Sequence, residues 1–231
     1  MRWCVSDIHG YYGLFCRLLD KIGFGEGDTL YVLGDFLDKG PEPIRLAKML
    51  LSMPEVRCIK GNHEYDFARE YRFRMQNEGG RVETIAKMRA RFPDGEKLTE
   101  EIAEAIAALP LWLEESDFIG VHAGLPVRAG RVLPPEEAEP SFLVNDRNFK
   151  EPNVLPASDK CVIYGHTPVR YLTGRDEILF YPRPGIAHPR EIGDCIKVHI
   201  DTGTYLGGVL GCICLDDCRT CYVRGAGIIV G

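Results

Sequence analysis

The residues of this 231-residue chain that could bind metal ions stand directly after short apolar runs. They comprise two carboxylates, one amide and three imidazoles, and most have a glycine beside them. The six residues are Asp7, His9, Asp35, Asn62, His122 and His166. Oxygen and nitrogen donors of these kinds suit Mn²⁺, Fe or Zn²⁺, whereas a structural zinc site prefers thiolates. Because a carboxylate such as Asp35 can bridge two cations about 3.5–4 Å apart, the set predicts a two-metal centre.

The elements that must position these residues are predicted from the apolar runs themselves. Each run ends at a glycine or a polar residue, a pattern typical of buried strands. The runs span residues 3–5, 30–33, 56–59, 118–121 and 161–164. Helical patterns over 14–22 and 41–52 separate the first three runs, with Pro41 in the first turn of the second helix. This βαβαβ order predicts a parallel sheet, whose ligands bind beyond the carboxyl ends of its strands.

The middle of the chain predicts a helical insertion at about residues 65–110, within a single domain of residues 1–231. Thr99 is expected to cap the last helix of this insertion. Tyr71 and Phe73 are expected to pack in the core, and stacking on a nucleobase is the alternative. The arginines of the same helix are interpreted as a solvated face, and the alternative is a basic lip that selects anionic substrates.

Nine cysteines without a signal-peptide pattern indicate free thiols in a reducing compartment, so a cytoplasmic location is expected. Four of them cluster near the C-terminus: Cys212, Cys214, Cys218 and Cys221. The C-x₂-C spacing of the last two leaves a structural zinc site open. The other interpretation is a hairpin that turns at Asp216 and buries Cys212 and Cys214 as small apolar residues. His188 and His199 are interpreted as structural.

Composition excludes several classes of function. Hydrophobic residues make up 45% of the chain and charged residues 27%, which is ordinary for a globular protein. No apolar run approaches the ~20 residues of a membrane-spanning helix. The net charge of −6 disfavours non-specific binding to nucleic acid, which depends on neutralising phosphates. We expect neither nucleic acid nor membrane as a partner, and the sequence does not determine the oligomeric state.

Taken in order, the polar motifs resemble the calcineurin-like metallophosphoesterases. The motifs are Asp7-Ile8-His9-Gly10, Gly34-Asp35-Phe36-Leu37-Asp38-Lys39-Gly40, Gly61-Asn62-His63-Glu64, His122-Ala123-Gly124 and Gly165-His166-Thr167-Pro168. The Gly-Asn-His-Glu block is most similar to the phosphoprotein-phosphatase branch, particularly its compact bacterial members. The resemblance implies an α/β (α+β) fold, a two-sheet β-sandwich flanked by helices, with a dimetal site at the carboxyl ends of the strands.

The resemblance also implies a role for each residue of the motifs. The metal ligands are Asp7 and His9 for one ion, Asp35 as the bridge, and Asn62, His122 and His166 for the other. Two divalent ions are expected, Mn²⁺ first, with Fe and Zn²⁺ as alternatives. His63 is implied to be the general acid that protonates the leaving oxygen, and Asp38 is implied to orient its imidazole.

Two positively charged side chains, Lys39 and Arg147, and the amide of Asn62 are expected to bind the substrate phosphate. Lys39 stands where this branch usually has Arg, so a compact point charge replaces a planar fork. Arg147, in the loop before the Gly-His-Thr motif, is the expected second cation, although the Trp that often precedes it is missing. The alternative for Arg147 is an ion pair at the surface.

The implied reaction is in-line attack on phosphorus by a hydroxide that bridges two cations, which lower the pKa of water toward ~7. The expected substrates are phosphomonoesters, foremost phosphoserine and phosphothreonine in proteins. The alternative substrates are dinucleoside polyphosphates such as diadenosine tetraphosphate, or other nucleotides and small phosphoesters. A catalytically silent binding module is expected to lack some ligands, and this sequence lacks none of the six.

Overall fold

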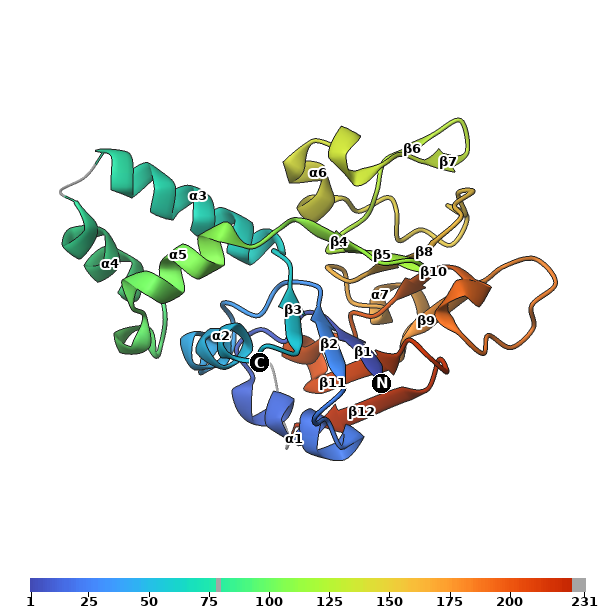
Figure 1. Cartoon of the computed structure of the whole chain (residues 1–231), viewed down its shortest axis with the longest axis horizontal. Coiled ribbons are helices and arrows are strands. Elements are labelled where there is room, and N and C mark those ends of the chain that lie inside the picture. Colours follow the sequence, from blue (N-terminus) through green and yellow to red (C-terminus); the bar gives the residue numbers. More distant parts are fainter. Residues whose placement is uncertain (78–79, 226–231) are drawn as a thin grey trace.

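The computed structural model describes residues 1–77 and 80–225 of the chain. Two five-stranded sheets pack against each other, with strand orders β12-β11-β1-β2-β3 and β4-β5-β8-β10-β9 (Figure 1). The first sheet consists of β1 (Arg2–Val5), β2 (Thr29–Val32), β3 (Val56–Cys58), β11 (Val209–Cys214) and β12 (Thr220–Arg224). The second consists of β4 (Trp112–Glu114), β5 (Phe118–Val121), β8 (Cys161–Tyr164), β9 (Leu179–Pro182) and β10 (Cys195–His199). The two-sheet sandwich expected from the motifs is confirmed.

The first sheet follows the predicted βαβαβ order, because β1, β2 and β3 pair in parallel. Its crossover helices are α1 (Tyr12–Ile22) and α2 (Pro43–Ser52). α1 ends at Gly23, whose left-handed φ of 66° closes the helix. α2 begins at Pro43 rather than at the predicted Pro41, because the N–H of Glu42 donates to the carbonyl of Gly10 at 3.0 Å and keeps this stretch non-helical.

Three apolar cores separate the layers of the molecule. α1 and α2 cover the outer face of the first sheet, where Leu18 packs near Leu30. The core between the sheets includes Tyr31 of β2 and Ile163 of β8. α6 (Pro140–Asn145) and the segment that follows it cover the outer face of the second sheet around Tyr164. In this second sheet β5, β8 and β10 are parallel, so their carboxyl ends share one edge.

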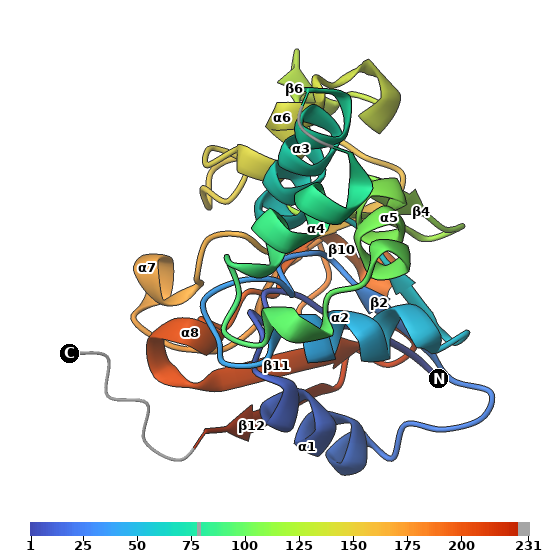
Figure 2. The same cartoon turned by 90° about the vertical axis from the view of Figure 1, so that its left-hand side faces the viewer.

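The predicted helical insertion stands to one side of the sheets (Figure 1, Figure 2). It contains α3 (Asn62–Asn77), α4 (Arg81–Arg89), η1 (Gly95–Lys97) and α5 (Glu100–Ala108). Thr99 caps α5 as predicted, and its hydroxyl accepts the N–H of Ile102 at 3.4 Å. Tyr71 is buried as predicted, but Phe73 is 60% exposed. The core prediction is wrong for Phe73 because two residues along a helix rotate a side chain by about 200°, to the opposite face.

The C-terminal cysteines lie in the expected hairpin. Cys212 and Cys214 are buried in β11, and Cys212 stands opposite Cys221 of β12. Within residues 1–77 and 80–225, the groups of three or more acidic, histidine or cysteine ligands that lie in reach of one another include no cysteine. The hairpin interpretation therefore replaces the zinc alternative.

His199 is buried in β10 and stacks on Tyr164, with 4.6 Å between ring centroids.

Short elements complete the second half of the chain. They are β6 (Val127–Arg128), β7 (Arg131–Val132), η2 (Pro135–Glu137), α7 (Arg170–Thr173), η3 (Ile192–Asp194) and α8 (Thr204–Gly207). Among the described residues, no helix has both the length and the apolar character needed to cross a membrane.

Candidate metal centre

The six predicted ligands converge where the carboxyl ends of the parallel strands of both sheets meet. From the first sheet come Asp7 and His9 after β1, Asp35 after β2, and Asn62 at the start of α3. From the second sheet come His122 after β5 and His166 after β8. The backbone N–H of His166 donates to Asp7 Oδ2 at 3.0 Å, so the two sheets are joined within the site itself.

Asp35 occupies the middle of this cluster. Its Oδ1 lies 3.4 Å from His122 Nε2. Its Oδ2 lies 3.8 Å from His9 Nε2 and 3.9 Å from His63 Nε2. Potential ligand atoms lie within 4.8 Å of one another in two groups: His9, Asp35 and His63 in the first, and Asp35, His122 and His166 in the second. The carboxylate predicted to bridge two cations is the residue shared by both groups.

The remaining donors also fit a cation. Asn62 Oδ1 lies 3.1 Å from His122 Nε2 and 3.0 Å from His166 Nδ1. In the described structure His166 Nε2 is buried without a hydrogen-bond partner, which is costly unless that nitrogen binds a ligand. Asp7 Oδ1 lies 3.8 Å from His9 Nε2 on the other side. Carboxylate, amide and imidazole donors in this arrangement fit two divalent cations that accept nitrogen and oxygen ligands.

Burial and neighbouring charges together determine the protonation of the imidazoles. Burial lowers the pKa of His9 and of His166 to about 3. Both rings are therefore neutral near pH 7 and offer a lone pair, as a metal ligand must. His122 differs, because the charge of Asp35 outweighs its burial and raises the pKa of His122 to about 10. Burial likewise opposes ionisation of Asp35, but the charge of His122 prevails and lowers the pKa of that carboxyl.

The turns that carry the ligands are strained. The residues with left-handed backbone are Asp7 at φ 53°, His9 at φ 50°, Asp35 at φ 53° and His166 at φ 72°. A non-glycine residue in this region costs about 1–3 kcal/mol and persists only when its surroundings hold it. The surrounding structure must therefore contain groups that stabilise these turns.

Glu64 holds the turn at Asp35, a role that the motif analysis did not assign. Its fully buried carboxylate accepts the backbone N–H groups of Asp35 at 2.7 Å, Phe36 at 3.0 Å, Leu37 at 2.8 Å and Gly61 at 2.8 Å. The turn after β2 and the turn after β3 are thereby joined through the side chain of Glu64. The signal was present in the sequence, because Glu64 is the last residue of the Gly-Asn-His-Glu motif.

His63 and Asp38 lie together as the resemblance implied. His63 Nδ1 is 2.7 Å from Asp38 Oδ2, which leaves His63 Nε2 facing the metal cluster. Burial opposes protonation of His63, but the hydrogen bond to Asp38 and the charge of Asp35 outweigh it and raise the pKa of His63. Arg91, from the insertion, was missed by sequence reasoning. Its Nη2 lies 3.7 Å from Asp38 Oδ2, and no local pattern distinguishes Arg91 from the other arginines of that segment.

Lys39, one of the two expected phosphate-binding cations, contacts the cluster directly. Lys39 Nζ is 3.3 Å from His9 Nε2 and 3.8 Å from the ring centroid of Tyr205. Tyr205, which was also missed, attracts the ammonium through its ring face. Arg147 is exposed. It is near enough to His166 that its charge, after burial and the charge of His122, helps to lower the pKa of that imidazole.

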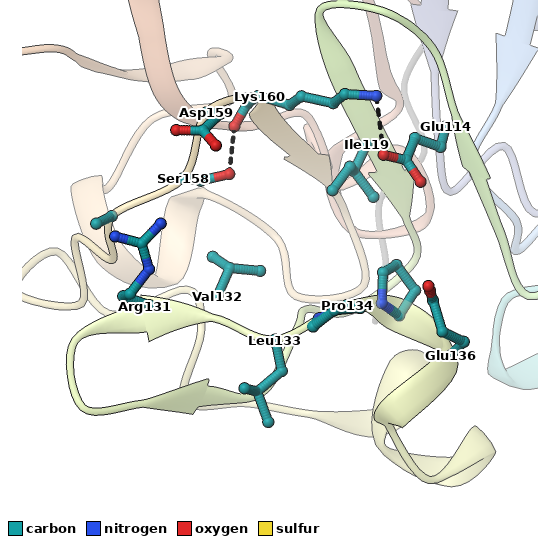
Figure 3. A pocket seen from close by; sticks show the side chains of 12 residues that line it. Glu114, Ile119, Arg131, Val132, Leu133, Pro134, Glu136, Ser158, Asp159 and Lys160 are labelled. Atoms are coloured by element: carbon teal, nitrogen blue, oxygen red, sulfur yellow. Dashed lines mark hydrogen bonds and ion pairs between the residues drawn. The ribbon is translucent and has the colours of Figure 1, made fainter.

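A pocket of about 300 Å³ lies elsewhere on the second sheet (Figure 3). Arg131 and Leu133 line one side of it and residues 157–160 line the other. Lys160 Nζ lies 2.8 Å from Glu114 Oε1 at its edge. The described residues that line the pocket include none of the predicted site residues, so we assign it no part in this chemistry.

Comparison with known sequences agrees with this geometry. The family model for "Calcineurin-like phosphoesterase" matches residues 2–188. The asymmetrical bis(5'-nucleosyl)-tetraphosphatase of Geobacillus thermodenitrificans is 26% identical over 89% of this chain and 86% of its own length. The symmetrical bis(5'-nucleosyl)-tetraphosphatase of Neisseria meningitidis is 30% identical over 54% of this chain and 43% of its own length.

Comparison with solved structures supports the same fold. The crystal structure of a candidate diadenosine tetraphosphatase covers 97% of this chain and 93% of its own, with a TM-score of 0.69 and 18% identity. A protein serine/threonine phosphatase from Saccharomyces cerevisiae covers 98% of this chain and 80% of its own, with a TM-score of 0.53 and 17% identity. At such identities the likeness shows the fold alone. Together with the family match over residues 2–188, these observations show that the chain belongs to the calcineurin-like phosphoesterases, a family of metal-dependent hydrolases.

Proposed function

We propose that this protein hydrolyses dinucleoside polyphosphates of the bis(5'-nucleosyl)-tetraphosphate type. The observation that carries the proposal is the similarity to an asymmetrical tetraphosphatase over 89% of this chain and 86% of that protein. The motifs alone favoured phosphoserine and phosphothreonine in proteins. The likeness to a yeast serine/threonine phosphatase supports only a shared fold, so the phosphoprotein substrate becomes the alternative.

In this proposal the residues of the cluster divide the work of phosphoester hydrolysis. The six ligands hold two divalent cations, with Mn²⁺ as the expected metal. Bound cations supply Lewis-acid stabilisation of the phosphoryl oxygens and make water more acidic. Lys39, Arg147 and Asn62 bind the oxygens of the phosphoryl group under attack. His63 Nε2 donates a proton to the leaving oxygen, while Asp38 holds Nδ1 of the same ring.

Aromatic rings beside the cluster support a nucleotide substrate. The ring of Tyr205 meets His9 edge to face, with 5.2 Å between centroids. Burial raises the pKa of Tyr205, and the nearby hydroxyl of Tyr171 raises it further. The side chain of Tyr171 is 63% exposed. Stacking of a base on an aromatic ring contributes about 1–3 kcal/mol and tolerates every base. The side chain of phosphoserine or phosphothreonine has no comparable flat group to place there.

The test is a substrate panel measured with Mn²⁺ and again with EDTA. We expect kcat/KM for diadenosine tetraphosphate to exceed that for a phosphoserine peptide by about 100-fold or more, because only the nucleotide uses the aromatic rings. ATP and AMP are the expected products of diadenosine tetraphosphate. If two molecules of ADP form instead, the cleavage lies in the middle of the tetraphosphate chain. Faster hydrolysis of the peptide would favour the alternative, and activity that survives EDTA would contradict a metal-dependent reaction.

Tyr171→Ala tests the aromatic contribution directly. We expect it to raise KM for diadenosine tetraphosphate about fivefold to tenfold, in line with the loss of one stacking interaction. Hydrolysis of p-nitrophenyl phosphate should change less than twofold. Phe73→Ala is the comparison variant, because Phe73 is an equally exposed aromatic on α3, and a larger rise in KM in this variant would favour the alternative that Phe73 stacks on the base. An equal rise in KM for both substrates would contradict base stacking at Tyr171.

A further inference from the structure

Lys197 is a buried cation on the outer face of the second sheet and is not one of the predicted metal ligands. It lies in β10 and is 0% exposed, although the alternation of polar and apolar residues in this strand is typical of a sheet with one solvated face. Its Nζ donates to the carbonyl oxygens of Phe149 at 2.6 Å and Glu151 at 2.9 Å. The ring centroids of Tyr181 and Phe149 lie 4.5 Å and 5.2 Å from the same nitrogen.

The two carbonyls belong to the loop that carries Arg147. Asp146 Oδ2 accepts the N–H groups of Asn148 at 3.0 Å and Phe149 at 2.6 Å, so the backbone turns tightly around Arg147. The Arg147 side chain in this turn is exposed, whereas Phe149, two residues later, is buried. Lys197 holds this segment on the sheet together with the buried ring of Phe149 and the hydroxyl of Tyr181, which donates to the carbonyl of Lys150 at 3.4 Å.

The other side of the loop packs against the strand end that carries a metal ligand. A Cβ added to Gly124, two residues after His122, would lie 2.4 Å from Phe149 Cβ, so the loop and the strand end are in close contact. The backbone N–H of Ala123 donates to the carbonyl of Leu143 at 2.8 Å, just before the loop. The loop is therefore held between the segment that follows His122 on one side and Lys197 on the other.

We propose that Lys197 is a positioning residue for the phosphate-binding cation Arg147: its buried ammonium pairs with the carbonyls of Phe149 and Glu151 and thereby presents Arg147 to the metal centre. An apolar side chain at 197 would leave the buried carbonyl of Phe149 without a donor and the carbonyl of Glu151 with only the N–H of Val154 at 3.0 Å, and the loop would move to hydrate them. The inference rests on the proposed role of Arg147 in binding phosphate. It does not depend on which phosphoester is the substrate.

A double-mutant cycle on kcat/KM tests this coupling. The variants are Arg147→Ala, Lys197→Met and the double variant, assayed with Mn²⁺ on p-nitrophenyl phosphate and on diadenosine tetraphosphate. We expect Arg147→Ala to lower kcat/KM about 10-fold to 100-fold, as loss of a charge-assisted hydrogen bond does. Lys197→Met alone should lower it about fivefold or more. In the Arg147→Ala background, Lys197→Met should add less than a twofold loss.

The competitive inhibition constant of inorganic phosphate provides a second readout. It should rise in Lys197→Met by about the same factor as kcat/KM falls, because both report the placement of Arg147. Lys150→Met is the matched control, since Lys150 lies in the same loop and its ammonium pairs with the side chain of Glu151. This control should stay within twofold of the wild type, and the metal content of every variant should equal that of the wild type.

The outcomes separate the two hypotheses. No effect of Arg147→Ala would overturn the phosphate-binding role of Arg147, whatever Lys197→Met does. A loss in Arg147→Ala together with an equal fold-loss from Lys197→Met in both backgrounds would overturn the positioning role alone and indicate general damage to the fold. If Lys197→Met does not yield folded protein, Lys197→Arg keeps the charge and the donors. Activity of Lys197→Arg near the wild type supports the inference, and a loss that persists in the Arg147→Ala background overturns it.

Discussion

At the scale of single residues, the site depends most on Asp35. Its carboxylate lies between three imidazoles, with His122 Nε2 at 3.4 Å and His63 Nε2 at 3.9 Å. Its backbone is held in a left-handed turn, where its N–H donates to the buried carboxylate of Glu64 at 2.7 Å. Asp35 belongs to both groups of potential ligands, whereas His63 belongs to one. The charge of Asp35 therefore matters for both cation positions.

Asp35→Asn keeps the size of this side chain and removes its charge. We expect it to lower kcat further than His63→Asn does, because His63→Asn removes only a proton donor that contributes about 10²–10⁴ to the rate. Both variants should be assayed at saturating Mn²⁺, and the metal content per chain should be measured for each. A loss in Asp35→Asn equal to or smaller than the loss in His63→Asn would contradict the bridging role.

At the scale of elements, the turns after neighbouring strands interlock so closely that some positions admit only glycine. A Cβ on Gly61 would lie 2.1 Å from Asp35 Oδ1, and a Cβ on Gly165 would lie 2.3 Å from Asp7 Oδ2. Glycine at the end of a strand commonly serves a sharp turn of the backbone. That reason holds for Gly34, with φ at 82°, but Gly61 and Gly165 are required by the close approach of a ligand carboxylate.

Gly61→Ala should therefore displace Asp35 and damage the metal centre. We expect it to lower the free energy of unfolding by about 1–3 kcal/mol, as overpacking does, and to abolish binding of Mn²⁺ at the shared position. Gly13→Ala in α1 is the control, because an added Cβ there meets no heavy atom within 4 Å. Alanine in a helix should raise the stability of this control by about 0.5–1 kcal/mol. Urea unfolding and metal titration measure both effects, and full Mn²⁺ binding by Gly61→Ala would refute the steric argument.

At the scale of the whole molecule, the metal centre exists only because one sheet packs on the other. The first sheet supplies Asp7 and the second supplies His166, whose N–H donates to Asp7 Oδ2 at 3.0 Å. The second sheet also buries polar side chains on its outer face, where His199 stacks on Tyr164 beneath the segment after α6. The stability of the sandwich therefore depends on the charge state of His199, a buried group at the end of β10.

The free energy of unfolding should decrease as the pH is lowered, because of His199. Burial lowers the pKa of His199 to about 3 from its ordinary 6.5, so the unfolded chain binds a proton in this interval that the folded chain does not. The free energy of unfolding should decrease as the pH falls from 6.5 toward 3, by up to about 1.4 kcal/mol per pH unit from this group. Urea unfolding in EDTA at pH 7.5, 5.5 and 4.5 measures the slope.

His199→Phe should reduce this slope by nearly one proton, because phenylalanine keeps the stacked ring and removes the titrating nitrogens. His188→Gln is the control and should keep the slope of the wild type, since His188 is exposed. An unchanged slope in His199→Phe would show that burial of His199 does not govern the acid sensitivity.

The sequence by itself was sufficient to predict the local structural features of this protein. Strand and helix periods, the glycine and polar residues that end each strand, and the cap at Thr99 depend on neighbours along the chain, so they could be predicted. The order of the motifs indicated the family through its resemblance, and the parallel strands bring the motif residues together because their carboxyl ends share one edge.

Only the tertiary structure decided which polar residues away from the motifs support the site. Lys197 lies in a strand with a common alternating pattern, and Arg91 lies among other arginines, so neither could be distinguished from a solvated side chain. Their roles come from contacts with Phe149 and Asp38, which are distant in the chain. The physical reason is that burial of a charge depends on what covers it, and in this protein the covering segment comes from a different part of the sequence.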